Sequence, residues 1–208
     1  MSQKTHQIAV LTGDLVGSTK LGAQKIERAF AALENCARLQ EAWMGAPLHF
    51  TRHRGDGWQV ALAEPKYALR SGLAFRAALK ALGPEFDSYI GIAQGTVTGD
   101  IATDLNDATE EVFQASGRSL EAAKSSKHRL KYNKGGAHEG MAILLGRVSG
   151  EWTANQAATI LYALPPNSSV NSSQIARELD KSRQSVSKTL EAAWVDEVRD
   201  ALMTMENT

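Results

Sequence analysis

The feature that most constrains this sequence is the turn Gly55-Asp56-Gly57, which lies between two segments with β-strand character, residues 48–54 and 58–63. Glycine tolerates the positive backbone torsions of a tight hairpin, and Asp-Gly between β-like runs is a strong short-range hairpin signal. A hairpin here places the Asp56 carboxylate at its tip. Taken alone, Asp56 is a turn residue, because Asp-Gly turns are common without any ligand.

A second acid follows the apolar run 8–11, in the segment Gly13-Asp14-Leu15-Val16-Gly17-Ser18-Thr19. If this first strand pairs with the hairpin, Asp14 and Asp56 lie at neighbouring strand ends. Paired carboxylates beside a turn of small residues, whose N–H groups can face phosphate, are what a magnesium–nucleotide site requires. The two aspartates are therefore candidate metal ligands, and in the alternative interpretation they only cap turns.

Hydrophobic spacing and Gly/Pro breaks predict the elements around these turns. Helices are expected over residues 20–43, 65–82 and 109–123, and a strand with a return over residues 89–93 and 95–99. The resulting β-α-β-β-α-β order predicts an α+β fold, an antiparallel sheet with helices on one face in a ferredoxin-like arrangement.

The segment from Lys124 to Lys134 contains five Lys or Arg and His128 but no acid. A solvated basic loop or an edge strand is one interpretation. Phosphate binding is the other, because the segment follows a helix expected to pack near the aspartates.

Gly135-Gly136 is the best candidate linker, and it divides the chain into predicted domains 1–136 and 137–208. Apolar residues at helical spacing predict helices over residues 141–152 and 153–164, with Thr153 as the cap of the second. Residues 142–145 alone have the composition of an edge strand. We expect the helix there.

Residues 172–192 match the spacing of a helix-turn-helix, with Ala176 as the small residue that lets the two helices cross closely. The candidate DNA-binding residues, on the exposed start of the second helix, are Ser182, Arg183, Gln184, Ser185 and Lys188. Double-stranded DNA is one expected partner, and packing or dimerisation is the alternative. Residues 151–208 contain five Lys or Arg against eight Asp or Glu, which predicts weak non-specific DNA affinity.

Composition limits the partners and the compartment. Lys+Arg and Asp+Glu both number 23, so the whole chain has no bulk attraction to nucleic acid or anionic membrane. The single cysteine, Cys36, excludes an internal disulfide and has the spacing of a buried helix residue rather than a nucleophile. No apolar run reaches membrane-spanning length and the N-terminus is polar, so a cytoplasmic location is expected.

Four segments together resemble the catalytic domain of class III nucleotidyl cyclases, and more closely the related SatD-like family of small bacterial proteins. They are Gly13-Asp14-Leu15-Val16-Gly17-Ser18-Thr19, Arg54-Gly55-Asp56-Gly57, Gly91-Ile92-Ala93-Gln94-Gly95-Thr96-Val97 and Val112-Phe113-Gln114-Ala115-Ser116-Gly117-Arg118. The resemblance covers roughly residues 8–132. From Trp152 onward the chain looks like the helix-turn-helix tail that some of those proteins carry.

The resemblance implies a two-ion Mg²⁺ or Mn²⁺ site held by Asp14, Asp56 and the Leu15 carbonyl. The implied nucleotide-binding residues are Val16, Gly17, Ser18 and Thr19 at the triphosphate, and Arg52 with Asn106 or Asp107 at the base. A homodimer is expected, because cyclase-like sites are completed across a two-fold interface.

The sequence departs from the cyclase pattern in the third helix. Where cyclases carry an Asn and, four residues later, a transition-state Arg, this chain has Phe113 and Gly117. Arg118 is a candidate catalytic substitute, although one residue turns a helix by about 100° and gives it another face.

We therefore expect a regulatory protein that couples a metal–nucleotide domain to a DNA-binding tail, as a transcriptional regulator does. The alternative is an active Mg/Mn-dependent nucleotidyl cyclase, or another nucleotidyl-transfer enzyme, whose tail serves dimerisation. A protein with neither activity is a third interpretation.

Overall fold

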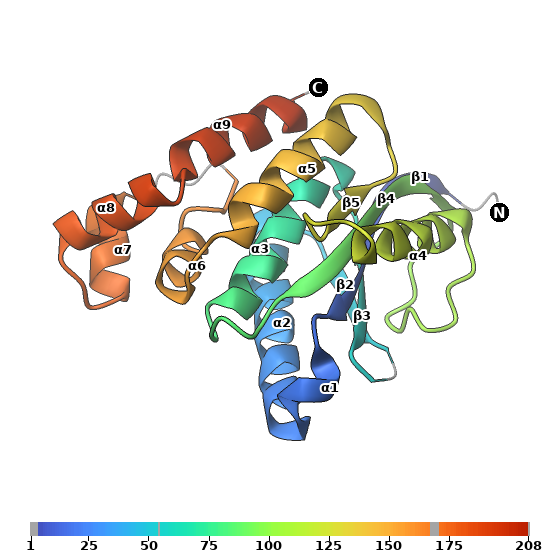
Figure 1. Cartoon of the computed structure of the whole chain (residues 1–208). Helices are drawn as coiled ribbons and strands as arrows, with labels where there is room; N and C mark the ends of the chain where they lie inside the picture. The colour runs from blue at the N-terminus through green and yellow to red at the C-terminus, as the bar shows by residue number, and fades with distance from the viewer. Residues whose placement is uncertain (1–3, 54, 167–170, 208) are drawn as a thin grey trace.

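The computed structural model describes residues 4–53, 55–166 and 171–207, and it confirms the mixed α+β class (Figure 1). Its sheet has five strands in the order β2-β3-β1-β4-β5. The strands are β1 Thr5–Leu15, β2 Leu48–Arg52, β3 Gly57–Leu62, β4 Ser88–Thr98 and β5 Leu130–Tyr132. The first four pair antiparallel, whereas β5 runs parallel to β4 and makes the wholly antiparallel expectation wrong. A helical crossover between β4 and β5 makes this parallel pairing possible.

The central strands fix the register of the candidate site. β1 lies between β3 and β4, with Asp14 opposite Gly57 and Leu15 opposite Ser88. The expected strand and return over residues 89–99 is wrong, because β4 is one continuous strand. Its glycines serve close packing instead of a turn: a Cβ at Gly91 would lie 2.1 Å from the backbone nitrogen of Leu120.

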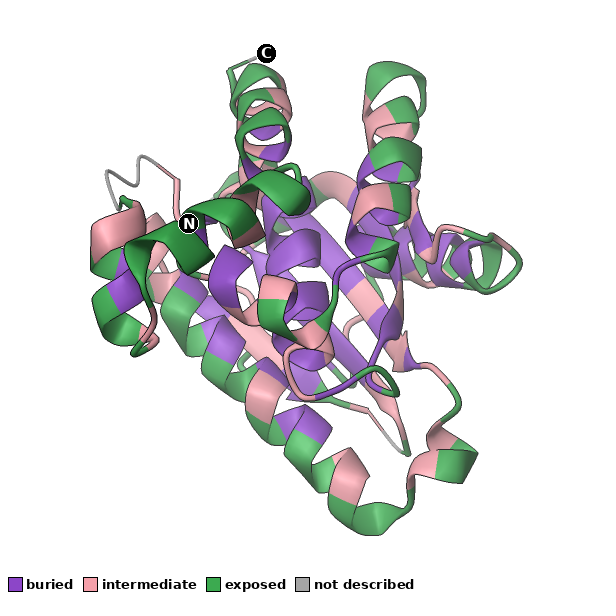
Figure 2. Ribbon diagram, turned by 60° about the vertical axis from the view of Figure 1, so that its left-hand side comes forward, coloured by how far each residue is buried: buried purple, intermediate pink, exposed green. Residues whose placement is uncertain are grey.

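Helices cover both faces of the sheet, so the expectation of helices on one face only is wrong (Figures 1 and 2). α2 (Ala23–Met44) and α3 (Ala68–Lys80) pack with Leu11 and Trp58 on one side. α4 (Glu111–Lys124) packs with Ile8 and Val10 on the other. Because neighbouring residues of a strand point to opposite faces, the unbroken apolar run in β1 fills both cores.

Two predicted helices are subdivided. The helix expected over residues 20–43 is broken at Gly22, whose φ is +78°, into α1 (Ser18–Leu21) and α2. The helix expected over residues 65–82 begins with a short 3₁₀ turn, η1 (Pro65–Tyr67), and continues as α3. Glycine is the residue best suited to such a left-handed break.

The C-terminal part of the chain is helical. Its helices are α5 Gly136–Gly150, α6 Ala154–Ile160, α7 Ser172–Glu178, α8 Arg183–Ala192 and α9 Val195–Glu206. α5 confirms that residues 142–145 are helical and do not form an edge strand. Thr153 is the N-cap of α6, as predicted, and forms a capping box there. In the described part of the chain, no helix has both the length and the apolar character needed to cross a bilayer.

One apolar cluster runs from the sheet face under α2 and α3 into α5, α6 and the tail. A buried ion pair supports this contact: Arg70 Nε of α3 lies 2.6 Å from the Glu206 carboxylate at the end of α9. The same guanidinium donates through Nη1 to the Leu164 carbonyl at 2.6 Å. The C-terminal helices are therefore joined to α3, which packs on the sheet.

Candidate functional site

The sheet brings the two predicted aspartates together. Asp14, the second-to-last residue of β1, lies opposite Gly57, the first residue of β3, and the Leu15 N–H donates to the Asp56 carbonyl at 3.2 Å. Partial burial and the neighbouring Asp56 charge raise the pKa of Asp14 above its ordinary value. Partial burial acts in the same direction on Asp56, but hydrogen bonds with Ser18 and Asp14 hold its pKa below the ordinary range. The two carboxyl groups thus form one electrostatic unit.

Buried contacts hold the Asp14 backbone in place. The fully buried Ser88 hydroxyl donates to the Asp14 carbonyl at 2.9 Å and accepts from the Trp58 indole at 3.1 Å. Gly13 leaves room for that indole, because a Cβ there would lie 2.0 Å from the Trp58 ring. Ser88 was not identified from the sequence as part of the site, because it carries no motif of its own.

Lys124, the last residue of α4, supplies the site with a cation. Its ammonium lies 2.8 Å from Oδ2 of Asp14 and 3.1 Å from Glu121. The hydrogen bond to Asp14 raises the pKa of Lys124 above its ordinary value. The sequence signal was the basic run from Lys124 to Lys134 after a helix expected near the aspartates, but it did not single out this residue.

The turn after β1 lies beside the two acids. The Val16 N–H donates to the Asp87 carbonyl at 2.9 Å, and Gly17 takes φ +63°, a left-handed conformation that suits glycine. Ser18 and Thr19 line a hollow of about 390 Å³ that also reaches Asp56 and Arg52. The structure therefore brings Ser18 and Thr19, two of the four predicted triphosphate residues, to the same hollow as Asp56.

The predicted base-reading residues line a second hollow, of about 790 Å³, which shares Arg52 with the first. Asn106 and Asp107 both face it, with His53 on the hairpin side. Asn106 donates through its backbone and its side chain to Asp104, both at 2.9 Å. The hairpin residue Arg54 lies outside the described residues.

The Arg52 guanidinium is already paired. It donates to both carboxylate oxygens of Glu27, at 2.8 and 3.0 Å, and lies 3.9 Å from the centre of the Phe30 ring. Glu27 was not predicted from the sequence, because its pair with Arg52 joins α2 to β2 and the two residues are 25 positions apart. A nucleotide base that contacts the Arg52 guanidinium therefore also lies near the Glu27 carboxylate.

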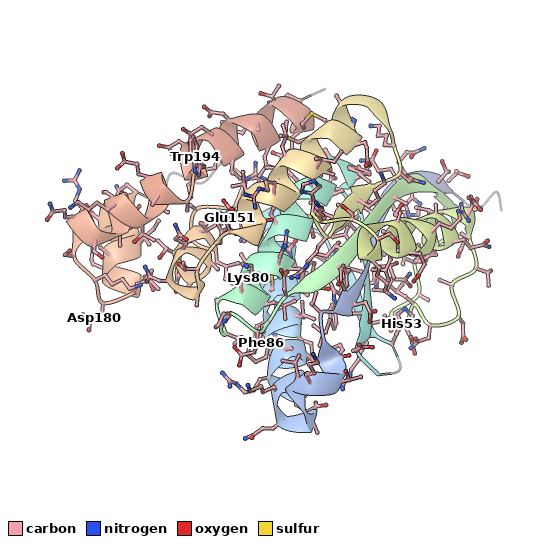
Figure 3. The ribbon with its side chains drawn as sticks, in the orientation of Figure 1. His53, Lys80, Phe86, Glu151, Asp180 and Trp194 are labelled. Carbon is pink, nitrogen blue, oxygen red and sulfur yellow. The ribbon has the colours of Figure 1, made fainter. Side chains whose placement is uncertain are left out.

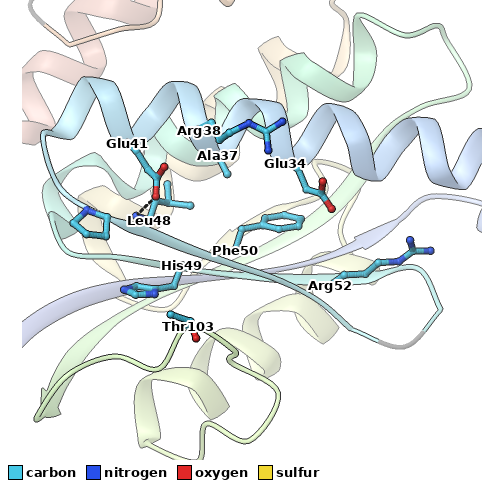
Figure 4. A pocket seen from close by; sticks show the side chains of 10 residues that line it. Glu34, Ala37, Arg38, Glu41, Leu48, His49, Phe50, Arg52 and Thr103 are labelled. Atoms are coloured by element: carbon cyan, nitrogen blue, oxygen red, sulfur yellow. Dashed lines mark hydrogen bonds between the residues drawn. The ribbon is translucent and has the colours of Figure 1, made fainter.

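Another hollow, of about 460 Å³, lies between α2 and β2 (Figure 4). Glu34, Arg38 and Glu41 reach it from α2, and His49 and Arg52 from β2. Glu41 also accepts the Leu48 N–H at 3.0 Å. This hollow contains neither aspartate of the candidate site.

The candidate catalytic residue Arg118 lies on the exposed side of α4, where it forms an ion pair with Glu111. Lys124 lies six positions further along the helix, which is about 240° around its axis. Phe113 is buried under α4 among the residues of the second core. The structure thus places Lys124, one residue beyond the predicted helix 109–123, and not Arg118, beside Asp14.

Two further basic residues of this segment form ion pairs within the protein. Arg129 contacts Asp87 at 2.8 Å, and Lys131 contacts Glu139. Residues 130–132 form the edge strand β5, as one interpretation predicted. Cys36 is buried, which raises its thiol pKa to about 12 and agrees with its predicted structural role.

The predicted DNA-binding residues lie far from the aspartates. The Ser182 hydroxyl caps α8 by accepting the Ser185 N–H at 3.1 Å, as predicted. Arg183, Gln184 and Lys188 are exposed on the same helix. In Figure 3, His53 at the hairpin and Asp180 at the α7–α8 connection lie on opposite sides of the molecule.

The residues present fit a divalent cation only in part. Asp14 and Asp56 carry two negative charges, and Lys124 neutralises one of them, so the site retains room for added positive charge. Carboxylate oxygens are the ligands that Mg²⁺ prefers. Within residues 4–53, 55–166 and 171–207, however, no group of three or more His, Cys, Asp or Glu side chains has metal-binding geometry.

No protein-family model matches the chain, and no curated protein sequence matches it significantly. Solved structures that resemble it include nucleotidyl cyclases at low identity. The guanylyl cyclase Cya2 is 18% identical over 59% of this chain and 73% of its own, with a TM-score of 0.44. A bacterial light-regulated adenylyl cyclase is 17% identical over 62% and 76%, with a TM-score of 0.47. The active GGEEF domain of a diguanylate cyclase from Vibrio cholerae is 15% identical over 58% and 78%, with a TM-score of 0.43.

Proposed function

We propose that this protein binds a nucleoside triphosphate together with a divalent cation at the Asp14–Asp56 site. The observation that carries the proposal is the convergence of these two carboxylates, from β1 and the β2–β3 hairpin, beside the hollow lined by Ser18 and Thr19. A divalent ion bound there would neutralise phosphate charge and fix the phosphate geometry. Asp14 and Asp56 would hold the ion, and Ser18 would orient Asp56.

The site supports binding better than cyclase catalysis. Arg118 is paired with Glu111 on the exposed side of α4, and Phe113 packs in the core, so neither matches the Asn and Arg roles that the resemblance implies. Losing a transition-state arginine costs several powers of ten in phosphoryl-transfer rate. A regulatory metal–nucleotide domain is therefore the proposed role of residues 1–136.

Thermal melting with Mg²⁺ and each of the four nucleoside triphosphates tests the proposal. We expect the melting temperature to rise with at least one of them, because a ligand at 100 times its dissociation constant adds about 2.7 kcal/mol to the free energy of unfolding. Asp14→Asn and Asp56→Asn should each reduce this rise, since both remove a metal ligand. Asp196→Asn, at an exposed position in the first turn of α9, is the matched control and should leave the rise in melting temperature unchanged. No rise with any triphosphate contradicts the proposal.

A second candidate function is DNA binding by the start of α8. It is supported by the exposed Arg183 and Lys188 on a capped helix that packs on α7, on the side of the molecule away from His53 of the hairpin (Figure 3). The helix-turn-helix interpretation places such a second helix in the major groove.

Selection from random duplexes at roughly 50 mM salt, where phosphate contacts are strong, tests this function. Arg183→Ala should cost about 1–3 kcal/mol if it meets a guanine edge, and Lys188→Ala should weaken all sequences alike and lower the salt slope. Arg147→Ala, on the exposed side of α5, is the control. If no motif is enriched and both variants bind duplexes as the wild type does, the α7–α8 pair serves packing or dimerisation.

A further inference from the structure

The strand β2 has one unpaired side. It ends the strand order of the sheet, and its other side pairs with β3. Where the two strands meet the hairpin, the His53 N–H donates to the Gly57 carbonyl at 2.9 Å. Bonded and non-bonded pairs alternate along an antiparallel ladder, so the backbone N–H and C=O groups of Leu48, Phe50 and Arg52 face away from β3. These groups form an edge that a further strand can pair with.

The hollow of about 460 Å³ next to α2 lies along this edge. Its lining includes Leu48, His49 and Phe50. Consecutive residues of a strand point to opposite faces of the sheet, so His49 and Phe50 can line one hollow only at the edge. Glu41 of α2 also reaches the edge and accepts the Leu48 N–H at 3.0 Å. In the view of Figure 4, α2 lies above the strand and Thr103 below it. The hollow therefore follows the backbone of β2 rather than one face of the sheet.

Two charged side chains of the hollow lack a partner of opposite charge. Glu34 and Arg38 are exposed on α2, one helical turn apart. The Arg38 guanidinium donates to the side chain of Asn35, and among the residues that the structure describes neither Glu34 nor Arg38 forms an ion pair. A two-fold axis beside them would place each Arg38 next to Glu34 of a second copy. The hollow is thus complementary in charge to itself, as an interface between two copies of one chain requires.

Phe50 is the middle one of the three outward-facing residues. A two-fold axis at Phe50 pairs this residue with its copy through both backbone groups, and it lets the Arg52 N–H donate to the Leu48 carbonyl of the second copy. The Phe50 ring is partly exposed and stacks on Trp58 with 6.4 Å between ring centres, so two such rings would meet on one face. The Arg52 guanidinium leaves the edge free, because it is bound to Glu27.

We propose that two copies of this chain pair antiparallel through their β2 edges, about a two-fold axis at Phe50, with Arg38 of each copy beside Glu34 of the other. The two sheets then form one continuous sheet. Each copy uses the same edge, so the pairing stops at two chains. This interface is independent of the proposed nucleotide site, because neither Asp14 nor Asp56 lines the hollow.

Sedimentation velocity of the full chain at tens of micromolar tests the charge pairing. The wild type should sediment as a dimer. Arg38→Glu and Glu34→Arg should each raise the dissociation constant of the dimer by about tenfold or more, because each substitution places like charges together on both sides of the axis. The double variant Glu34→Arg/Arg38→Glu restores opposite charges and should dimerise as the wild type does. Arg177→Glu, at an exposed position of α7, controls for the change in net charge and should leave the constant unchanged.

Disulfide cross-linking under mild oxidation tests the register. Phe50→Cys places a thiol at the axis, where the Cα atoms of a directly opposed bonded pair lie about 5.5 Å apart, within the range of a disulfide. This variant should form a covalent dimer. Arg52→Cys is the matched control in the same strand, because its two copies would lie about 14 Å apart and should not cross-link. The native Cys36 is buried and does not compete.

Three results would overturn the inference. The first is a wild type that sediments as a monomer. The second is a dimer whose dissociation constant both single charge reversals leave unchanged, because such a dimer uses another face. The third is a cross-link in Arg52→Cys, or none in Phe50→Cys when its circular dichroism spectrum matches that of the wild type. The charge reversals lie on the exposed side of α2, so they decide the question even if Phe50→Cys fails to fold. Thermal melting with nucleoside triphosphates tests the proposed function separately.

Discussion

At the scale of single residues, Asp87 supports the turn that carries the candidate site. Its carboxylate accepts from Arg76 at 2.8 and 2.9 Å and from Arg129 at 2.8 Å, and its carbonyl accepts the Val16 N–H. Burial acts to raise the pKa of Asp87, but the hydrogen bonds and charge of Arg76 hold it below the ordinary value. The ionised form is therefore the form that the fold stabilises.

We predict that Asp87→Asn lowers the free energy of unfolding by about 3–5 kcal/mol at pH 7, because it leaves the buried Arg76 without its carboxylate. The folded pKa lies below the unfolded value of about 3.9, so this stabilisation is present above about pH 4 and is lost as pH falls through the folded pKa. Urea unfolding of the wild type and the variant across the acid range measures the difference between their free energies of unfolding at each pH. A difference that does not narrow at low pH would contradict the role of the ionised carboxylate.

The sequence predicted the acids of the site better than their partners. Asp56 was identified from its Asp-Gly turn between strand-like segments, and Asp14 from its position directly after an apolar run, and both are local signatures. Lys124 and Glu27 were not, since each meets its partner across elements that no local pattern places together. The structure brings the predicted residues Ser18, Thr19 and Arg52 to one hollow, whereas their role in binding stays a prediction.

At the scale of elements, α4 shows the limit of periodicity. Its apolar spacing predicted a buried helix face, and the helix forms at Glu111–Lys124. Periodicity does not say which side of the sheet a helix covers. The deciding contacts are non-local: Gly91 lets the α4 backbone approach β4, and the Thr12 and Ser116 hydroxyls meet at 2.6 Å. The ferredoxin-like description therefore stays an interpretation, with α4 on the face opposite α2 and α3.

Gly91 at this contact and Gly117 in an open position of α4 predict opposite effects of a substitution to alanine. Gly91→Ala should destabilise by about 3 kcal/mol, because its Cβ would meet the backbone of Leu120 and Ser116 at 2.1 and 2.4 Å. Gly117→Ala should stabilise by roughly 0.5–1 kcal/mol, since nothing lies within 4 Å of its Cβ and alanine favours a helix interior. Thermal and urea unfolding measure both. Equal effects would mean that α4 does not pack closely on β4.

At the scale of the whole molecule, the tail and the sheet share one core. Gly135 caps α5 and Gly136 is its first residue, so the predicted linker also begins a helix that packs on α3 and β5. The division into 1–136 and 137–208 stays a prediction, as does the homodimer. Sequence patterns gave the helices of the tail but not this packing, because the Arg70–Glu206 contact joins residues 136 positions apart.

That contact carries the last prediction, that the two parts of the chain unfold together. The Arg70 and Glu206 side chains are 3% and 9% exposed, so Glu206→Ala leaves a buried guanidinium without its carboxylate and should cost about 3–5 kcal/mol. Glu197→Ala, at an exposed position on the same helix, should change stability by no more than about 0.5 kcal/mol. Urea unfolding followed by tryptophan fluorescence and by circular dichroism should give coincident transitions for all three proteins. If Glu206→Ala separates the two curves or moves only one, the tail folds apart from the sheet, and coupling between the aspartate site and α8 would lack a packed connection.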